Sequence, residues 1–166
     1  MTATDRLFQQ LQRHLREQEE VIDRLVAAGE DQLQALRDNN LDRLYEITGQ
    51  QEALSVQIRK NEEGRLAVQG MLENGLQLPP GTTFKELIAH APVVMKTPLE
   101  QLYGSLRRKM ADLKEVNYLC AVLIKKALLV NNRIVQILNA GGADNYGQKG
   151  ELKKQLPHRP VLNESV

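Results

Sequence analysis

Histidine and cysteine are the residue types in this chain best suited to bind metals or to act as nucleophiles. The three histidines, His14, His90 and His158, lie in separate segments and show no His-x3-His spacing. Cys120 is the single cysteine, so it can form neither an internal disulfide nor, alone, a thiolate metal site. It also falls on an apolar helical stripe, where a buried thiol is typical. We therefore predict no catalytic residue, no metal site and no enzymatic activity.

Phosphate and nucleic-acid sites require other patterns, and the sequence contains only weak versions of them. The run from residue 75 to 81 has the outline of a phosphate-binding loop, but it lacks the following Lys-Ser/Thr and contains two prolines, which cannot donate an N–H. Basic clusters at residues 107–109, 125–126 and 153–154 lie in a chain with 22 basic and 21 acidic residues and a net charge of +1. Nucleic-acid binders usually show a basic excess or aromatic stacking platforms. No cofactor and no nucleic-acid partner is expected.

The apolar segments are too interrupted for export or for a membrane span. The N-terminus carries Asp5 and several glutamines, whereas a secretory signal has a basic start followed by an apolar run. The most apolar stretch, 116–130, includes Lys125 and Lys126, and it is shorter than the about 20 apolar residues that a spanning helix needs. We expect a cytoplasmic protein with no direct membrane insertion.

Proline separates the helices that must position any functional surface. Residues 1–78 contain no proline, and four of the six prolines fall within residues 79–98. Before that break, apolar residues recur every three or four positions, which predicts helices over about 4–38 and 41–73. The intervening Asp38-Asn39-Asn40 is typical of caps and turns.

Two further helices are predicted after the break. Thr83 and Glu86 have capping-box spacing, which indicates a short helix near 84–90. Thr97-Pro98-Leu99-Glu100 combines an N-cap, a first-position proline and a third-position glutamate, and so predicts a helix over 98–139 that ends before two glycines. Residues 141–166 show no period, and we expect a flexible, disordered tail.

Composition agrees with this helical assignment. The chain has two phenylalanines, four tyrosines and no tryptophan, and 42% of its residues are hydrophobic. Aliphatic residues dominate that fraction, which suits long packed helices better than a sandwich or a barrel. The predicted fold is all-α: long antiparallel helices form a coiled-coil-like three-helix bundle in a helical domain of residues 1–140, and a disordered C-terminal tail follows.

One segment of the last predicted helix is unusually apolar. Between Val116 and Leu138, 16 of 23 residues are apolar. An inward stripe there includes Ile124, Leu128, Ile134 and Leu138, and a second apolar set lies beside it: Tyr118, Leu119, Val122, Leu123, Leu129, Val130, Val135 and Ile137. A helix that is apolar nearly all round must be buried nearly all round. Either the other helices or a second copy covers it, or it binds an amphipathic helix of a partner.

With these elements in place, the chain resembles the FlgN family of flagellar type III export chaperones over most of its length. The tail carries Tyr146-Gly147-Gln148-Lys149-Gly150, which is similar to the Tyr-Gly-x-x-Gly motif that family members carry after the third long helix. The helix itself contains Leu113 and Asn117 with the spacing of the family signature, and Cys120 stands where the family has a second asparagine.

The resemblance implies a chaperone that binds the C-terminal helical region of the hook-filament junction proteins FlgK and FlgL. It would prevent their premature assembly and deliver them to the cytosolic domain of the export-gate protein FlhA. Tyr146, flanked by Gly147 and Gly150, would dock to the gate, and Asn117 belongs to the family motif. The client-binding residues would be Val116, Leu119, Val122, Leu123, Val130 and Ile137.

A second interpretation needs no client. The same apolar surface would let the chain dimerise as a coiled-coil scaffold or structural protein. A homodimer therefore remains an alternative beside the chaperone.

Overall fold

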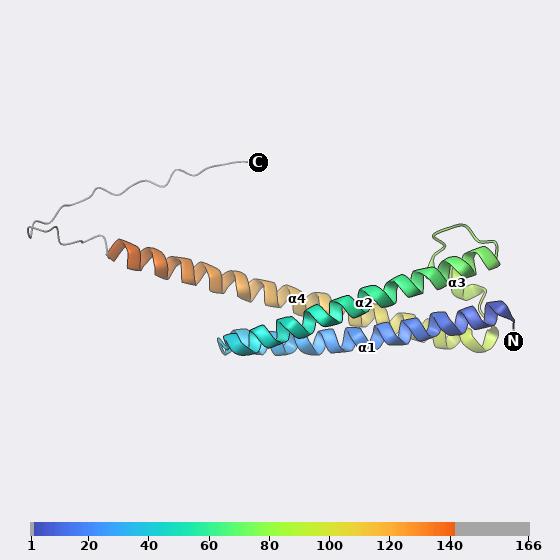
Figure 1. Ribbon diagram of the computed structural model, residues 1–166, viewed down its shortest axis with the longest axis horizontal. Helices are drawn as coiled ribbons and strands as arrows, with labels where there is room; N and C mark the ends of the chain where they lie inside the picture. The colour runs from blue at the N-terminus through green and yellow to red at the C-terminus, as the bar shows by residue number, and fades with distance from the viewer. Residues whose placement is uncertain (1, 142–166) are drawn as a thin grey trace, which may run out of the picture. The chain divides into compact units, whose positions relative to one another are not determined.

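The computed structural model describes residues 2–141 and shows four helices in that range (Figure 1). They are α1 (Ala3–Arg37), α2 (Leu41–Gly75), α3 (Phe84–Ala89) and α4 (Val93–Gly141). No strand occurs among the described residues, which confirms the all-α class. Contacts divide the chain into two compact units, Met1–Ile124 and Lys125–Val166, and α4 contributes residues to both.

Local side-chain chemistry sets most of the helix ends. Thr2 and Asp5 form a capping box at the start of α1, and Thr83 and Glu86 form the one expected at the start of α3. The amide N–H of Asn40 bonds to the carbonyl oxygen of Ala35 at 2.9 Å, with Asn39 between them in the left-handed region at φ 51°. This pattern closes the C-terminus of α1. The bounds of α1, α2 and α3 consequently differ from the expected ones by at most two residues.

The start of α4 corrects the sequence prediction. The helix begins at Val93, five residues before the expected start, and Pro98 lies inside it. Proline removes one N–H from the helical ladder, and here the carbonyl group left without that donor belongs to Val94. Because Val94 is 83% exposed, water can serve that carbonyl group. Thr97 and Pro98 therefore lie within an early turn and do not cap the helix.

Helices α1 and α2 form the main pair of the first unit. The side chain of Gln18 donates to Glu62, that of Asn61 donates to Glu17, and that of Gln51 donates to Gln32. Residue numbers on α2 fall as those on α1 rise, so the two helices run in opposite directions. At one close approach a Cβ added to Gly64 would lie 2.7 Å from the His14 ring, so only glycine fits there without a shift.

The first part of α4 runs in the same direction as α1. Ser105 bonds to Glu19, and the ammonium group of Lys109 lies 2.5 Å from Asp23 and 3.3 Å from Glu19. Apolar side chains from all four helices meet in the largest core cluster. Its buried members are Phe8, Leu11, Leu15, Ile22, Val68, Leu72, Leu87, Ile88, Ala91, Leu99, Leu102 and Leu106.

The described part of the second unit is the C-terminal segment of α4, from Lys125 to Gly141. Side-chain exposure is defined there as far as residue 139, and every residue from 125 to 139 is exposed. Of the expected tail, 141–166, Gly141 belongs to α4, and residues 142–166 lie outside the described residues. Within residues 2–141, each helix falls short of the length and apolarity needed to cross a membrane.

Candidate functional site

In the described part of the second unit, an apolar surface is exposed on α4. We call residues Lys125–Leu138 the exposed α4 segment. Its large apolar side chains are 47–67% exposed: Leu128, Leu129, Val130, Ile134, Val135, Ile137 and Leu138. Their spacing places apolar groups all round the helix, so covering one face would leave others in water. Exposed apolar patches of this kind mark interaction surfaces in soluble proteins.

The six residues predicted to bind a client fall into two groups. Val130 and Ile137 belong to the exposed α4 segment of the second unit. In the first unit Leu119 is exposed, whereas Val116, Val122 and Leu123 are half-buried. Asn117, the residue of the family motif, is exposed as well.

Val116 contributes to packing inside the first unit. A Cβ added at Gly29 of α1 would overlap the Val116 side chain, so the glycine permits a close approach of α1 and α4. One turn further along, the Cys120 thiol is buried and lies 3.5 Å from the carbonyl oxygen of Gly29. Burial raises the pKa of this thiol, which suits the buried packing role expected from the sequence.

The apolar stripe of α4 is buried in its first part and exposed in its later part. Leu99, Leu102 and Leu106 are buried at helical spacing, and Cys120, whose burial was expected, is buried as well. Ile124, Leu128, Ile134 and Leu138 continue the same stripe and are 39–67% exposed. The sequence had left open whether this part of the helix is covered. The sequence carried a signal for this surface in its excess of apolar residues, but periodicity alone could not show which side of the helix is covered.

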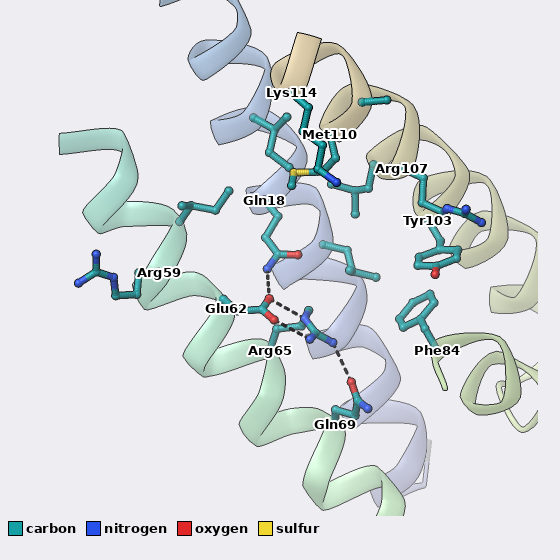
Figure 2. A pocket seen from close by; sticks show the side chains of 15 residues that line it. Gln18, Arg59, Glu62, Arg65, Gln69, Phe84, Tyr103, Arg107, Met110 and Lys114 are labelled. Carbon is teal, nitrogen blue, oxygen red and sulfur yellow. Dashed lines mark hydrogen bonds and ion pairs between the residues drawn. The ribbon is translucent and has the colours of Figure 1, made fainter. Parts of the chain in front are cut away.

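A groove in the first unit forms a second candidate surface (Figure 2). Its volume is about 860 Å³, and it lies between α2 and α4, with α1 contributing the buried residues Leu15, Gln18 and Ile22. From α2 it is lined by residues between Ile58 and Gln69, and from α4 by residues between Tyr103 and Lys114. Most of its surface is apolar.

A network of hydrogen-bonded polar side chains crosses one wall of this groove. The guanidinium group of Arg65 donates twice to the Glu62 carboxylate, each time at 2.7 Å, and once to Gln69. Gln18 of α1 also donates to Glu62, as Figure 2 shows. Hydrogen bonds from Arg65 lower the pKa of Glu62, and those to Glu62 raise the pKa of Arg65. Both groups therefore stay ionised near neutral pH.

An aromatic pair belongs to the same groove. Phe84 of α3 stacks on Tyr103 of α4 with ring centroids 4.7 Å apart and planes inclined by 26°. Such an offset pair adds about 0.5–1.5 kcal/mol beyond the burial of its area. Sequence reasoning missed both residues as site residues, because nothing in the chain indicates that positions 84 and 103 meet.

Other predicted features either lie elsewhere or fall outside the described residues. Tyr146, Gly147 and Gly150 lie beyond residue 141 and have no structural description. Among residues 2–141, no group of three or more His, Cys, Asp or Glu side chains is placed to hold a metal ion.

Comparison with known proteins identifies the family. Residues 1–154 match the family described as FlgN protein, a range that includes Tyr146, Gly147 and Gly150. No curated protein and no solved structure matches the chain significantly. Since the family match covers nearly the whole sequence, the chain belongs to the FlgN family of flagellar export chaperones.

Proposed function

We propose that this chaperone acts in the cytoplasm on the hook-filament junction proteins FlgK and FlgL. It binds their C-terminal helical region, prevents premature assembly, and delivers them to the cytosolic domain of the export-gate protein FlhA. The observation that carries the proposal is the exposed α4 segment, whose seven large apolar side chains lie in solvent in the described structure.

The physical argument is the cost of leaving that surface in water. Burying apolar area contributes about 25 cal/mol per Å², and part of this gain is offset by ordering the two partners. An amphipathic client helix could cover one face of the segment with anchors three and four residues apart. Because apolar residues surround α4 here, a client with two helical segments would bury more of it than a single helix would.

Charge supports an acidic client. Between residues 116 and 138 the chain carries Lys125, Lys126 and Arg133 and no acidic residue. Carboxylates flanking the apolar face of a client helix would therefore meet complementary charge, which favours fast association and correct orientation.

Delivery to the export gate is assigned to Tyr146. A tyrosine between glycine-containing stretches offers apolar area and a hydroxyl group to a receptor pocket. This role rests on the family motif formed with Gly147 and Gly150.

The decisive experiment replaces two exposed apolar residues with carboxylates. Val130→Asp with Ile137→Asp should weaken binding of the C-terminal segment of FlgK by at least about a hundredfold, because two charges would enter a desolvated contact. Isothermal titration calorimetry measures the affinity, and circular dichroism confirms that the variant is folded.

Matched controls come from the same helix and from the tail. Val93 and Val94 are 84% and 83% exposed, so Val93→Asp with Val94→Asp changes charge and apolarity equally at the opposite end of α4. This variant and Tyr146→Ala should bind the client normally. Equal loss in both double variants would contradict the assignment.

Dimerisation through the exposed α4 segment is the competing function. The exposed apolar side chains favour dimerisation, whereas Lys125, Lys126 and Arg133 of the two copies would repel one another. The molar mass in solution, measured with and without the client segment, separates the two. A stable dimer that ignores the client would support the scaffold.

A further inference from the structure

The groove of the first unit has the length of a short helix. Its lining on α4 runs from Tyr103 to Lys114 and on α2 from Ile58 to Gln69. At ~1.5 Å per residue each wall extends about 17 Å, which corresponds to roughly three helical turns. An amphipathic helix with apolar residues at i, i+3 or i+4 and i+7 presents anchors over the same distance.

The interior of the groove suits apolar anchors. Leu15, Ile22 and Leu106 line it and are buried, and Met110 is 39% exposed at the α4 wall. Methionine has three rotatable side-chain bonds and a polarisable sulfur, so it adapts to differently shaped anchors. The Phe84–Tyr103 stack belongs to the same lining and adds flat apolar area.

The rims of the groove are positively charged. Arg59 lies on the α2 side, and Arg107 lies opposite it on α4, both exposed, with their guanidinium groups turned outward (Figure 2). Lys114 adds a third cation on the α4 side. Glu62 is the acidic residue of the lining, and its carboxylate is already bonded to Arg65 and Gln18. The unpaired charge that a ligand meets is therefore cationic on both rims.

The cationic rims argue against two segments of this chain as occupants of the groove. The exposed α4 segment of a second copy carries three cations and no acidic residue, so it would bring like charges together. Residues 142–166 contain four Lys or Arg and three Asp or Glu, so they offer no acidic excess either. An acidic occupant must come from another protein.

From these observations we infer that the groove between α2 and α4 is a docking site for an amphipathic helix of a partner protein, with acidic residues on both sides of its apolar face. This surface lies wholly in the first unit and is additional to the exposed α4 segment. A partner helix of about three turns would place its anchors over Leu15, Ile22, Leu106 and Met110. Its carboxylates would meet Arg59 on one rim and Arg107 with Lys114 on the other.

A designed probe tests the inference on the full chain. The probe is a fluorescein-labelled helical peptide of about 14 residues, or four turns, with leucines on one face and glutamates on both flanks. Fluorescence anisotropy should show saturable binding that weakens as salt rises. A second peptide with lysines in place of the glutamates should bind at least about tenfold more weakly.

Adjacent residues provide a matched pair of variants. Arg59→Glu with Arg107→Glu reverses both rims, whereas Lys60→Glu with Arg108→Glu makes the same charge change at neighbouring exposed positions outside the groove. The rim variant should weaken probe binding about tenfold, and the neighbouring variant less than about twofold. The exposed α4 segment would also attract an acidic amphipathic helix, so both variants are compared in chains that carry Val130→Asp with Ile137→Asp. Saturable probe binding should persist in those chains, which separates this site from the exposed α4 segment.

Three results would overturn the inference. The two charge-reversal variants could weaken the probe equally, which would indicate general attraction to a cationic chain. The Val130→Asp, Ile137→Asp variant could abolish binding, which would place the probe on the exposed α4 segment. Finally, the wild type could sediment as a dimer that Arg59→Glu with Arg107→Glu dissociates, which would make a second copy the occupant.

Discussion

The two ends of the apolar stripe on α4 have similar sequences and different surroundings. Leu99, Leu102, Leu106 and Cys120, in the first unit, are buried against other helices. From Leu128 to Leu138, in the second unit, stripe residues of the same type are exposed. Apolar periodicity therefore predicts a helix in both places, but it does not predict whether the stripe is covered. Coverage depends on what the rest of the chain provides.

Contacts with α1 account for the covered part of the stripe. Hydrogen-bonded residues of α1 and α4 in the first unit lie 86 to 91 positions apart in the sequence. They join Glu19 to Ser105, Asp23 to Lys109 and Gly29 to Cys120, so α1 follows α4 through the buried part of its stripe.

The largest expected difference between the two ends is in stability. Leu99 is fully buried, so Leu99→Ala should lower the free energy of unfolding by about 2–5 kcal/mol through lost burial and a cavity. Leu138 is 67% exposed, so Leu138→Ala should change the free energy of unfolding by no more than about 0.5 kcal/mol. Urea denaturation measures both. Similar losses would mean that the second stripe is covered in solution, which would break the comparison.

The close approach at Gly29 offers a sharper test of the covered part. Gly29→Ala would force its Cβ into Val116, whose branched side chain is stiff, and should destabilise the protein by about 1–3 kcal/mol. Gly49 of α2 has no neighbour within 4 Å, so Gly49→Ala should stabilise it by up to about 1 kcal/mol through helix propensity.

Thermal and urea unfolding measure both the expected loss of stability in Gly29→Ala and the expected gain in Gly49→Ala. Adding Val116→Ala to Gly29→Ala should recover part of the lost stability, because it removes the overlapping methyl groups. If Gly29→Ala instead stabilised the chain as Gly49→Ala does, then α1 and α4 would not approach closely in solution.

The smallest expected effect is acid sensitivity of the covered part through Glu62. Its pKa is lowered in the folded state, so its contribution to stability is present above the unfolded value, near 4.5, and is lost as the pH falls through the folded value. The loss should be on the order of 1 kcal/mol or less, because water screens this half-exposed ion pair. Unfolding free energies of wild type and Glu62→Gln, measured from pH 6 to pH 3, give the difference. Parallel curves would show that the pair contributes nothing.

The two candidate surfaces were predictable to different degrees. The excess of apolar residues between 116 and 138 located the exposed α4 segment, and Val130 and Ile137 were named within it. The half-buried Val116 shows the limit of that reasoning, since its burial depends on a glycine 87 positions earlier. The groove was not foreseen at all, because its lining joins residues from 15 to 114 that share no local pattern.

The sequence by itself determined where most helices begin and end. Thr83 with Glu86, and Asn39 with Asn40, act through hydrogen bonds to backbone groups a few residues away, so their effect can be read without knowing the fold. The helix that contains Pro98 was predicted, but its start was placed five residues too late. An exposed early turn tolerates the missing N–H, so the helix begins before the proline. Tertiary structure decided which apolar faces are covered and which charges line a groove. Those properties depend on the lengths and offsets of helices far apart in the chain, and no local pattern records them.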